Sequence, residues 1–138
     1  WLRQFGHVED LADAMAAMLG NPKTFGQVYN VTGEEIVTQV GFVELIGEIL
    51  ERPVTLVHFH PALLKELAPT DLVFGQNLVY DCHAVYTTQK LRTELGLRPR
   101  YTLASGLRQT FEWYLKEGLD RRRVDFTFED RLLARIRP

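Results

Sequence analysis

The chain has 138 residues, of which 46% are hydrophobic and 25% are charged, and its formal net charge is -2. These proportions are those of a globular domain, and they exclude a disordered acidic tail, a collagen-like chain and a low-complexity linker. No apolar run approaches the ~20 residues that span a bilayer, so we expect no membrane partner. The lone cysteine, Cys82, excludes an internal disulfide framework and favours a reducing compartment. Because the chain begins at Trp1 and not at methionine, we expect it to be a piece of a longer protein.

The charge is distributed unevenly along the chain. Residues 1–89 hold four basic and eleven acidic side chains, whereas residues 90–138 hold twelve basic and seven acidic ones. A basic segment attracts phosphate groups and nucleic acid, although a solvated, salt-bridged helical surface gives the same pattern. The asymmetry is therefore more informative than the near-neutral total.

In the first half of the chain, apolar residues at helical spacing predict a helix that Gly20, Asn21 and Pro22 end. The apolar side of this helix comprises Val8, Leu11, Ala12, Met15, Met18 and Leu19. Residues 27–32 (QVYNVT) and 54–59 (VTLVHF) are β-branched and aromatic, which predicts two strands. Between them Thr38 is the expected N-cap of a second helix, whose apolar stripe is Phe42, Leu45, Ile46, Ile49 and Leu50.

In the second half, the pattern predicts a short helix over residues 61–67 and an irregular, mobile loop over residues 69–81. A further helix begins at Thr87 or Thr88 and ends at Gly96. Thr102 opens the next helix, which ends at Gly118 and is followed by an arginine-rich tail. Its expected buried side is Leu103, Leu107, Phe111, Tyr114 and Leu115. Helices that alternate with a few short strands predict a mixed α and β domain.

Several motifs are more specific than this pattern. Residues 3–12 (RQFGHVEDLA) resemble the R-D-(F/Y)-x-H-V-x-D-L-A segment of the extended short-chain dehydrogenase/reductases, the NAD-dependent epimerase/dehydratase family. Residues 27–33 (QVYNVTG) are similar to its G-x-x-Y-N-(V/I)-x-G strand. Residues 87–99 resemble its late (S/T)-x-K-A...E-L-G-W-x-P helix and turn, and residues 102–107 resemble the T-L-x-x-G-L start of its last helix.

Within that family the likeness extends to the chloroplast stem-loop-binding proteins and their cyanobacterial relatives. Residues 57–61 (VHFHP) are similar to their V-H-Y-D-P, and residues 81–83 (DCH) to their R-D-x-H-F. Residues 121–133 (RRRVDFTFEDRLL) resemble their K-K-x-x-F-x-x-D-D-x-I-L ending. Tyr80 departs from the pattern, because it stands where the family has an arginine.

The resemblance implies an α/β fold fragment, the C-terminal, substrate-side domain of an extended Rossmann-type dehydrogenase. We expect this domain to cover residues 1–118 and a basic tail to cover residues 119–138. The Rossmann half, with its glycine-rich turn for a dinucleotide, would precede the chain. No G-x-x-G-x-x-G or G-x-G-x-x-G occurs here, so we expect no cofactor on this fragment and NAD(P) only in the full-length protein.

Arg3 is the main candidate for binding a substrate, because the resemblance implies that the arginine of this motif contacts a substrate diphosphate. A guanidinium suits that role by its bidentate geometry, although an exposed arginine without a partner is the alternative. Tyr86 and Lys90 spell the Y-x-x-x-K of the superfamily's catalytic pair. We interpret this as coincidence, because that pair belongs to the Rossmann half, and we assign no catalytic residue.

Three histidines, His58, His60 and His83, would form a polar cluster if the second predicted strand meets residues 81–83. Separate structural histidines are the alternative, and H-x-x-x-H spacing for a metal is absent. We place His58, Tyr80 and His83 with Arg3 as substrate-binding candidates.

In the tail, Arg121, Arg122 and Arg123 are RNA-binding candidates, because arginines bind phosphate. The alternation of Val124, Phe126 and Phe128 predicts that these apolar side chains pack into the body. Three acidic residues, Asp125, Glu129 and Asp130, have the chemistry for Mg²⁺, but among arginines they are more typical of ion pairs. We assign no metal site.

Two functions remain open at this stage. One is an RNA-associated protein that binds stem-loops, for which the resemblance also implies a Mg²⁺-dependent endoribonuclease activity. The other is an NAD(P)-dependent sugar-nucleotide epimerase, dehydratase or reductase, in which this part binds the substrate. We expect a homo-oligomer or a ribonucleoprotein association, in the bacterial cytoplasm or the chloroplast stroma.

Overall fold

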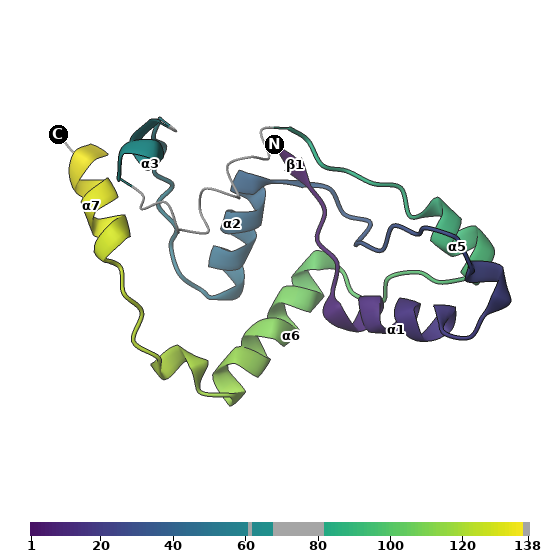
Figure 1. The fold of residues 1–138 in the computed structure, drawn as a ribbon. Helices are drawn as coiled ribbons and strands as arrows, with labels where there is room; N and C mark the ends of the chain where they lie inside the picture. The colour runs from purple at the N-terminus through teal and green to yellow at the C-terminus, as the bar shows by residue number, and fades with distance from the viewer. Residues whose placement is uncertain (61, 68–81, 137–138) are drawn as a thin grey trace.

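The computed structural model describes residues 1–60, 62–67 and 82–136, and most of its regular structure is helical (Figure 1). The elements are, in order, β1 (Leu2–Arg3), α1 (Val8–Met18), the 3₁₀ helix η1 (Pro22–Thr24), β2 (Val37–Thr38), α2 (Gln39–Ile49), α3 (Ala62–Leu67), α5 (Gln89–Leu95), α6 (Leu103–Lys116), the 3₁₀ helix η2 (Leu119–Arg121) and α7 (Thr127–Ile136). No helix in these described ranges is long and apolar enough to cross a membrane.

The helices form an open arch and not a closed bundle (Figure 1). Helices α1 and α5 lie at one end, α3 packs on α7 at the other end, and α2 packs on α6 between them. Strands β1 and β2 pair antiparallel, with Leu2 opposite Thr38 and Arg3 opposite Val37. This pairing brings the first residues of the chain to the start of α2.

The predicted helix boundaries are confirmed where a cap specifies them. The hydroxyl of Thr38 accepts the amide N–H of Gly41 at 2.9 Å, and the hydroxyl of Thr102 accepts that of Ser105 at 3.1 Å. Gly96 and Gly118 follow α5 and α6 with φ of +68° and +65°, a conformation that glycine adopts without steric cost. The short helix predicted over residues 61–67 is observed as α3, whereas the loop predicted over residues 69–81 lies outside the described residues.

The predicted strands are wrong. Residues 27–32 and 54–59 pair with no other described segment, and the strands that do form, β1 and β2, were not predicted. A β-branched composition indicates that a segment fits a sheet, but a strand also needs a partner to complete its hydrogen bonds. The described part of the chain supplies none to either segment.

The apolar sides predicted for two helices are not fully covered. Much of the apolar side predicted for α1 is open to solvent, with Val8 71%, Met15 63% and Leu19 86% exposed. On α6 the predicted buried side is only partly covered, because Tyr114 and Leu115 are exposed. Helical spacing identifies the apolar side of a helix, but it does not supply the neighbour that covers this side. Among the described apolar residues only Ala14, Leu91 and Leu132 are buried.

The arginine-rich tail ends in a packed helix. Leu132 of α7 is buried, and the guanidinium of Arg135 forms an ion pair with Glu66 of α3 at 2.9 Å. The packing predicted for Val124 and Phe126 is wrong, since these side chains are 56% and 58% exposed. Because α7 begins at Thr127, the strand-like alternation of the sequence does not continue through Phe128.

Replacing Thr102 by alanine should lower the free energy of unfolding by about 1 kcal/mol, because the substitution leaves an N–H group in the first turn of α6 without its acceptor. Urea denaturation of both chains would measure this loss. Thr93→Ala is the matched control, because the Thr93 hydroxyl donates only to carbonyls of its own helix. Equal losses in the two variants would contradict the capping role.

Candidate functional site

The candidate substrate site lies at β1, where Arg3 is held by backbone carbonyls. Its guanidinium Nη1 donates to the carbonyl oxygens of Leu2, at 3.1 Å, and of Cys82, at 2.5 Å. Arg3 is half-buried, so part of its charge stays accessible. The contact with Cys82 fixes the position of a cation next to the segment that starts at residue 82.

His83 lies beside the same strand. Its ring atom Nδ1 accepts the amide N–H of Leu2 at 2.9 Å, and the amide of Ala84 donates to the carbonyl of Leu2 at 3.0 Å. Acceptance at Nδ1 leaves the proton of the neutral ring on Nε2, so His83 presents a hydrogen-bond donor. The structure therefore brings together two of the four predicted substrate-binding residues, Arg3 and His83.

The other two predicted residues are not part of this group as described. Tyr80 lies outside the described residues, and His58 is exposed on the segment that precedes α3. His60 accepts the amide N–H of Ala62 near the start of α3 at 3.2 Å, whereas His83 accepts that of Leu2, so these two histidines contact different segments. Residues 1–60, 62–67 and 82–136 contain no group of three His, Cys, Asp or Glu side chains that could hold a metal ion.

The Y-x-x-x-K sequence does not form a pair on one helix face. Tyr86 precedes α5, which begins at Gln89, and it is 57% exposed. Lys90 contacts other groups: its Nζ donates to the side-chain oxygen of Gln27 at 2.7 Å and lies 4.8 Å from the ring centroid of Tyr29. The lysine thus joins α5 to residues 27–29, a contact that accounts for it without catalysis.

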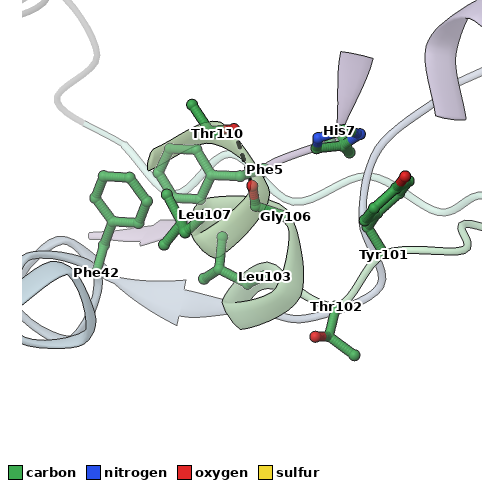
Figure 2. A pocket seen from close by; sticks show the side chains of 10 residues that line it. Phe5, His7, Phe42, Tyr101, Thr102, Leu103, Gly106, Leu107 and Thr110 are labelled. Carbon is green, nitrogen blue, oxygen red and sulfur yellow. Dashed lines mark hydrogen bonds between the residues drawn. The ribbon is translucent and has the colours of Figure 1, made fainter. Parts of the chain in front are cut away.

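A small cavity lies beyond β1, and aromatic side chains form two of its walls (Figure 2). Phe5 stacks on Phe42 with ring centroids 4.1 Å apart, and His7 stacks on Tyr101 with centroids 3.9 Å apart. The cavity has a volume of about 180 Å³ and is closed on α6 by Leu103, Gly106, Leu107 and Thr110. A methyl group at Gly106 would lie 3.1 Å from the His7 ring, so glycine allows this close approach.

Next to His7, carboxylates of α1 are held by residues about 90 positions later in the chain. Glu9 accepts the phenol of Tyr101 at 2.5 Å and the amide group of Gln109 at 2.9 Å. Asp10 accepts the backbone N–H groups of Arg100, at 2.8 Å, and Tyr101, at 3.4 Å. The sequence analysis did not identify the roles of Glu9, Tyr101 and Gln109. The spacing of residues along one helix shows which of them share a face, but it does not reveal which distant residues they contact.

These hydrogen bonds determine the protonation of the network. The bond from Tyr101, followed by that from Gln109, lowers the pKa of Glu9 from its ordinary value of 4.5. The same bond to Glu9 raises the pKa of the Tyr101 phenol above its ordinary value. A carboxylate that stays charged and a phenol that keeps its proton are suited to bracing the fold and not to exchanging protons at neutral pH.

The predicted RNA-binding residues occupy a second, separate surface. Arg121, Arg122 and Arg123 are exposed at the end of η2, and none of them forms an ion pair with another described residue. The pairing expected between the acidic residues of the tail and arginine is not observed for Asp125. Its carboxylate accepts the N–H and hydroxyl of Thr127, and these bonds lower the pKa of Asp125. Asp125 therefore stabilises the start of α7.

Comparisons with curated proteins place this arrangement in a family. The chain is 30% identical over 138 residues to the chloroplast stem-loop binding protein of 41 kDa b of Arabidopsis thaliana, covering 97% of this chain and 34% of that protein. It is 26% identical over 121 residues to dTDP-glucose 4,6-dehydratase of Escherichia coli, covering 83% of this chain and 29% of that enzyme. The chain spans about a third of the length of the curated relatives it matches. No protein-family model matches it.

Solved structures give the same result. The dTDP-glucose 4,6-dehydratase of Bacillus anthracis in complex with NAD is 25% identical with a TM-score of 0.60, covering 83% of this chain and 32% of that one. The enzyme WbmF of Bordetella bronchiseptica in complex with NAD⁺ and UDP is 25% identical with a TM-score of 0.57. The match covers 87% of this chain and 31% of that one. The fold is thus that of part of an extended Rossmann-type short-chain dehydrogenase/reductase. The chain belongs to the NAD-dependent epimerase/dehydratase family.

Replacing Tyr101 by phenylalanine should raise the pKa of Glu9 towards 4.5, because the largest cause of its lowering is removed. A carboxyl group whose pKa is lowered in the folded state stabilises the fold fully at pH values above its ordinary pKa. This stabilisation is lost as the pH falls through the lowered pKa. The free energy of unfolding of the variant should therefore be lower than that of the wild type at pH 7. The difference between the two free energies should become smaller as the pH falls. Urea denaturation at several pH values, with carboxyl NMR of Glu9, would measure both effects.

Tyr86→Phe is the matched control for this experiment, because its hydroxyl has no hydrogen-bond partner among the described residues. This variant should leave the pH dependence of unfolding unchanged. An unchanged pKa of Glu9 in Tyr101→Phe would contradict the assigned cause.

Proposed function

We propose that this chain is the C-terminal, substrate-side portion of an NAD-dependent epimerase/dehydratase-like protein that binds RNA stem-loops through the arginines after α6. The observation that carries the proposal is the exposure of Arg121, Arg122 and Arg123 without ion pairs in the described structure. Free guanidiniums bind phosphate oxygens in a bidentate way, and three neighbouring ones favour a polyanion.

The surroundings of the arginines support this role. Val124 and Phe126 follow them directly and are more than half exposed, so an aromatic face is available beside the cations. Aromatic side chains stack on unpaired bases, as found in loops and at the ends of RNA stems. The pairing of Arg135 with Glu66 holds the far end of the tail on α3, which limits the entropy lost when the arginines bind.

The comparisons support the same proposal. The similarity to the chloroplast stem-loop binding protein covers 97% of the chain, whereas that to the Escherichia coli dehydratase covers 83%. In the proposed division, residues 1–118 form the substrate-side domain and residues 119–138 form the basic tail. A ribonucleoprotein in a bacterial cytoplasm or a chloroplast stroma fits these relatives. We assign no residue to the endoribonuclease activity that the resemblance implies.

Replacing Arg121, Arg122 and Arg123 together by alanine should weaken binding of a stem-loop RNA by at least about 10-fold at physiological salt. It should also lower the slope of log Kd against log salt by about 2, because each lost phosphate contact removes about 0.7–0.9 from the slope. Fluorescence anisotropy at several salt concentrations would measure both quantities.

The matched control replaces three other exposed arginines, Arg52, Arg98 and Arg108, which lie outside the tail. It removes the same net charge, so a general electrostatic effect would weaken both variants equally. Unchanged affinity and slope in the tail variant would exclude the tail as the RNA contact.

A second function is favoured by the site at β1. The guanidinium of Arg3 is fixed beside Cys82 and His83, and the structural relative WbmF is in complex with UDP. In this alternative the full-length protein is an NAD(P)-dependent enzyme on a sugar nucleotide, and Arg3 binds the diphosphate.

Under this alternative, Arg3→Gln in the full-length protein should weaken binding of UDP by about 10–100-fold, the loss expected for a charged hydrogen-bonding group. Isothermal titration calorimetry would measure the affinity. Arg98→Gln is the control for a change of charge alone, and the thermal unfolding of each variant would show whether the fold at β1 is kept. An unchanged UDP affinity in Arg3→Gln, or no UDP binding by the wild type, would exclude this function.

A further inference from the structure

Residues 82–86 lie alongside β1, and a side chain supplies part of the connection between them. The amide of Ala84 donates to the carbonyl of Leu2 at 3.0 Å, which is an ordinary backbone bond. The amide of Leu2, in contrast, donates to the imidazole Nδ1 of His83 at 2.9 Å. A ring nitrogen thus takes the place that a carbonyl oxygen has in a regular pair of strands.

Leu2 is also the residue through which Arg3 is held. The carbonyl of Leu2 accepts the guanidinium Nη1 of Arg3 at 3.1 Å, in addition to the amide of Ala84. The same Nη1 donates to the carbonyl of Cys82, the residue before His83, at 2.5 Å. The bond between His83 and Leu2 therefore joins the two backbone segments whose carbonyls hold the guanidinium.

This use of a histidine differs from that of two others in the chain. His7 and His60 each accept, at Nδ1, the N–H of the residue two positions later, at 3.3 Å and 3.2 Å. Those bonds stabilise one local turn each. His83 and Leu2 are 81 positions apart, so their bond fixes the place of β1 against a distant segment.

The bond to Leu2 requires a neutral ring. A neutral imidazole accepts a hydrogen bond at the nitrogen that carries no proton, whereas both nitrogens of the charged ring are donors. Protonation would therefore turn the Nδ1 of His83 from an acceptor into a donor that faces the N–H of Leu2. Histidine is the side chain that ordinarily changes its charge between about pH 5 and pH 8.

The neighbouring groups do not change their charge in the same range. Among the described residues they are Arg3 on β1, Cys82 next to His83 and, in the 138-residue chain, the amino group of Trp1. Arginine, cysteine and amino groups ordinarily keep their protons between about pH 5 and pH 7. The residues of β2 that pair with β1 are Val37 and Thr38, which carry no charge.

We infer that His83 is a positioning residue for Arg3, which acts only as the neutral imidazole and releases β1 when it is protonated. At neutral pH the ring holds Leu2 and thereby keeps the guanidinium between two carbonyls. Below about pH 6 the ring gains a proton, and Arg3 loses this arrangement. The inference deepens the second proposed function, because it makes the site assigned there to a diphosphate sensitive to pH, and it rests on that function for the ligand alone.

Hydrogen–deuterium exchange of the full-length protein tests the pH dependence. The protection factor of the Leu2 amide, which corrects for the intrinsic effect of pH, should fall at least about 10-fold between about pH 8 and pH 5, because a hydrogen bond is lost. The amide of Gly41, which donates to the hydroxyl of Thr38, is the internal control and should stay protected. An unchanged protection factor at Leu2, or an equal fall at Gly41, would overturn the inference.

Variants of the histidine identify the group that titrates. Asparagine places its side-chain oxygen where the imidazole has Nδ1, and this oxygen accepts at every pH. His83→Asn should therefore keep Leu2 protected at both pH values, whereas His83→Gln, whose polar atoms lie near the position of Nε2, should lose protection at both. His60→Asn is the matched control and should have the wild-type profile at Leu2. A fall in His83→Asn equal to that of the wild type would overturn the inference.

Chemical modification reports on Arg3 itself. At about pH 8, phenylglyoxal should modify Arg3 at least about 3-fold faster in His83→Gln than in the wild type, because the guanidinium has lost its fixed partners. His83→Asn should react at the wild-type rate. Equal rates in all three proteins, measured by mass spectrometry, would show that Arg3 is positioned without His83 and would overturn the inference.

Binding of UDP separates this inference from the second proposed function. A wild-type protein that binds no UDP but shows the pH-dependent protection of Leu2 would exclude the function and agree with the positioning role of His83. UDP binding without that pH dependence would agree with the function and overturn the inference.

Discussion

The attachment of α1 through its carboxylates is the interaction on which the rest of the structure depends. Asp10 accepts the backbone N–H groups of Arg100 and Tyr101, while Glu9 binds the side chains of Tyr101 and Gln109. Backbone donors are fixed in position, so these bonds set the rotation of α1 about its axis as well as its place. Once the polar side of the helix faces inward, its apolar side must face outward.

The same attachment organises the candidate substrate site. It places His7 on Tyr101 and thereby fixes the chain between α1 and β1, where Phe5 stacks on Phe42 of α2. Strand β1 then lies against residues 82–84, which brings the Arg3 guanidinium to the Cys82 carbonyl. A guanidinium fixed at this position has the bidentate donor geometry that suits a diphosphate.

The two proposed binding surfaces differ in their construction. At β1, Arg3 is half-buried and held by main-chain carbonyls, as suits one small, defined ligand. In the tail, exposed arginines lie on a connection between η2 and α7, as suits a polyanion recognised by charge and shape. The open side of α1 is apolar, and in this it differs from both of these surfaces.

The sequence alone determined the family, through motifs distributed along the chain, and it determined the helix boundaries at Thr38, Gly96, Thr102 and Gly118. These features are local, since a capping hydroxyl or a glycine with positive φ acts on residues within one turn. It also identified Arg3 and His83 as candidates. Only the tertiary structure decided which sides of α1 and α6 are covered, that residues 27–32 lack a strand partner in the described chain, and that Phe126 is exposed. Burial and strand pairing depend on segments distant in the sequence, and periodicity carries no information about whether those segments are present.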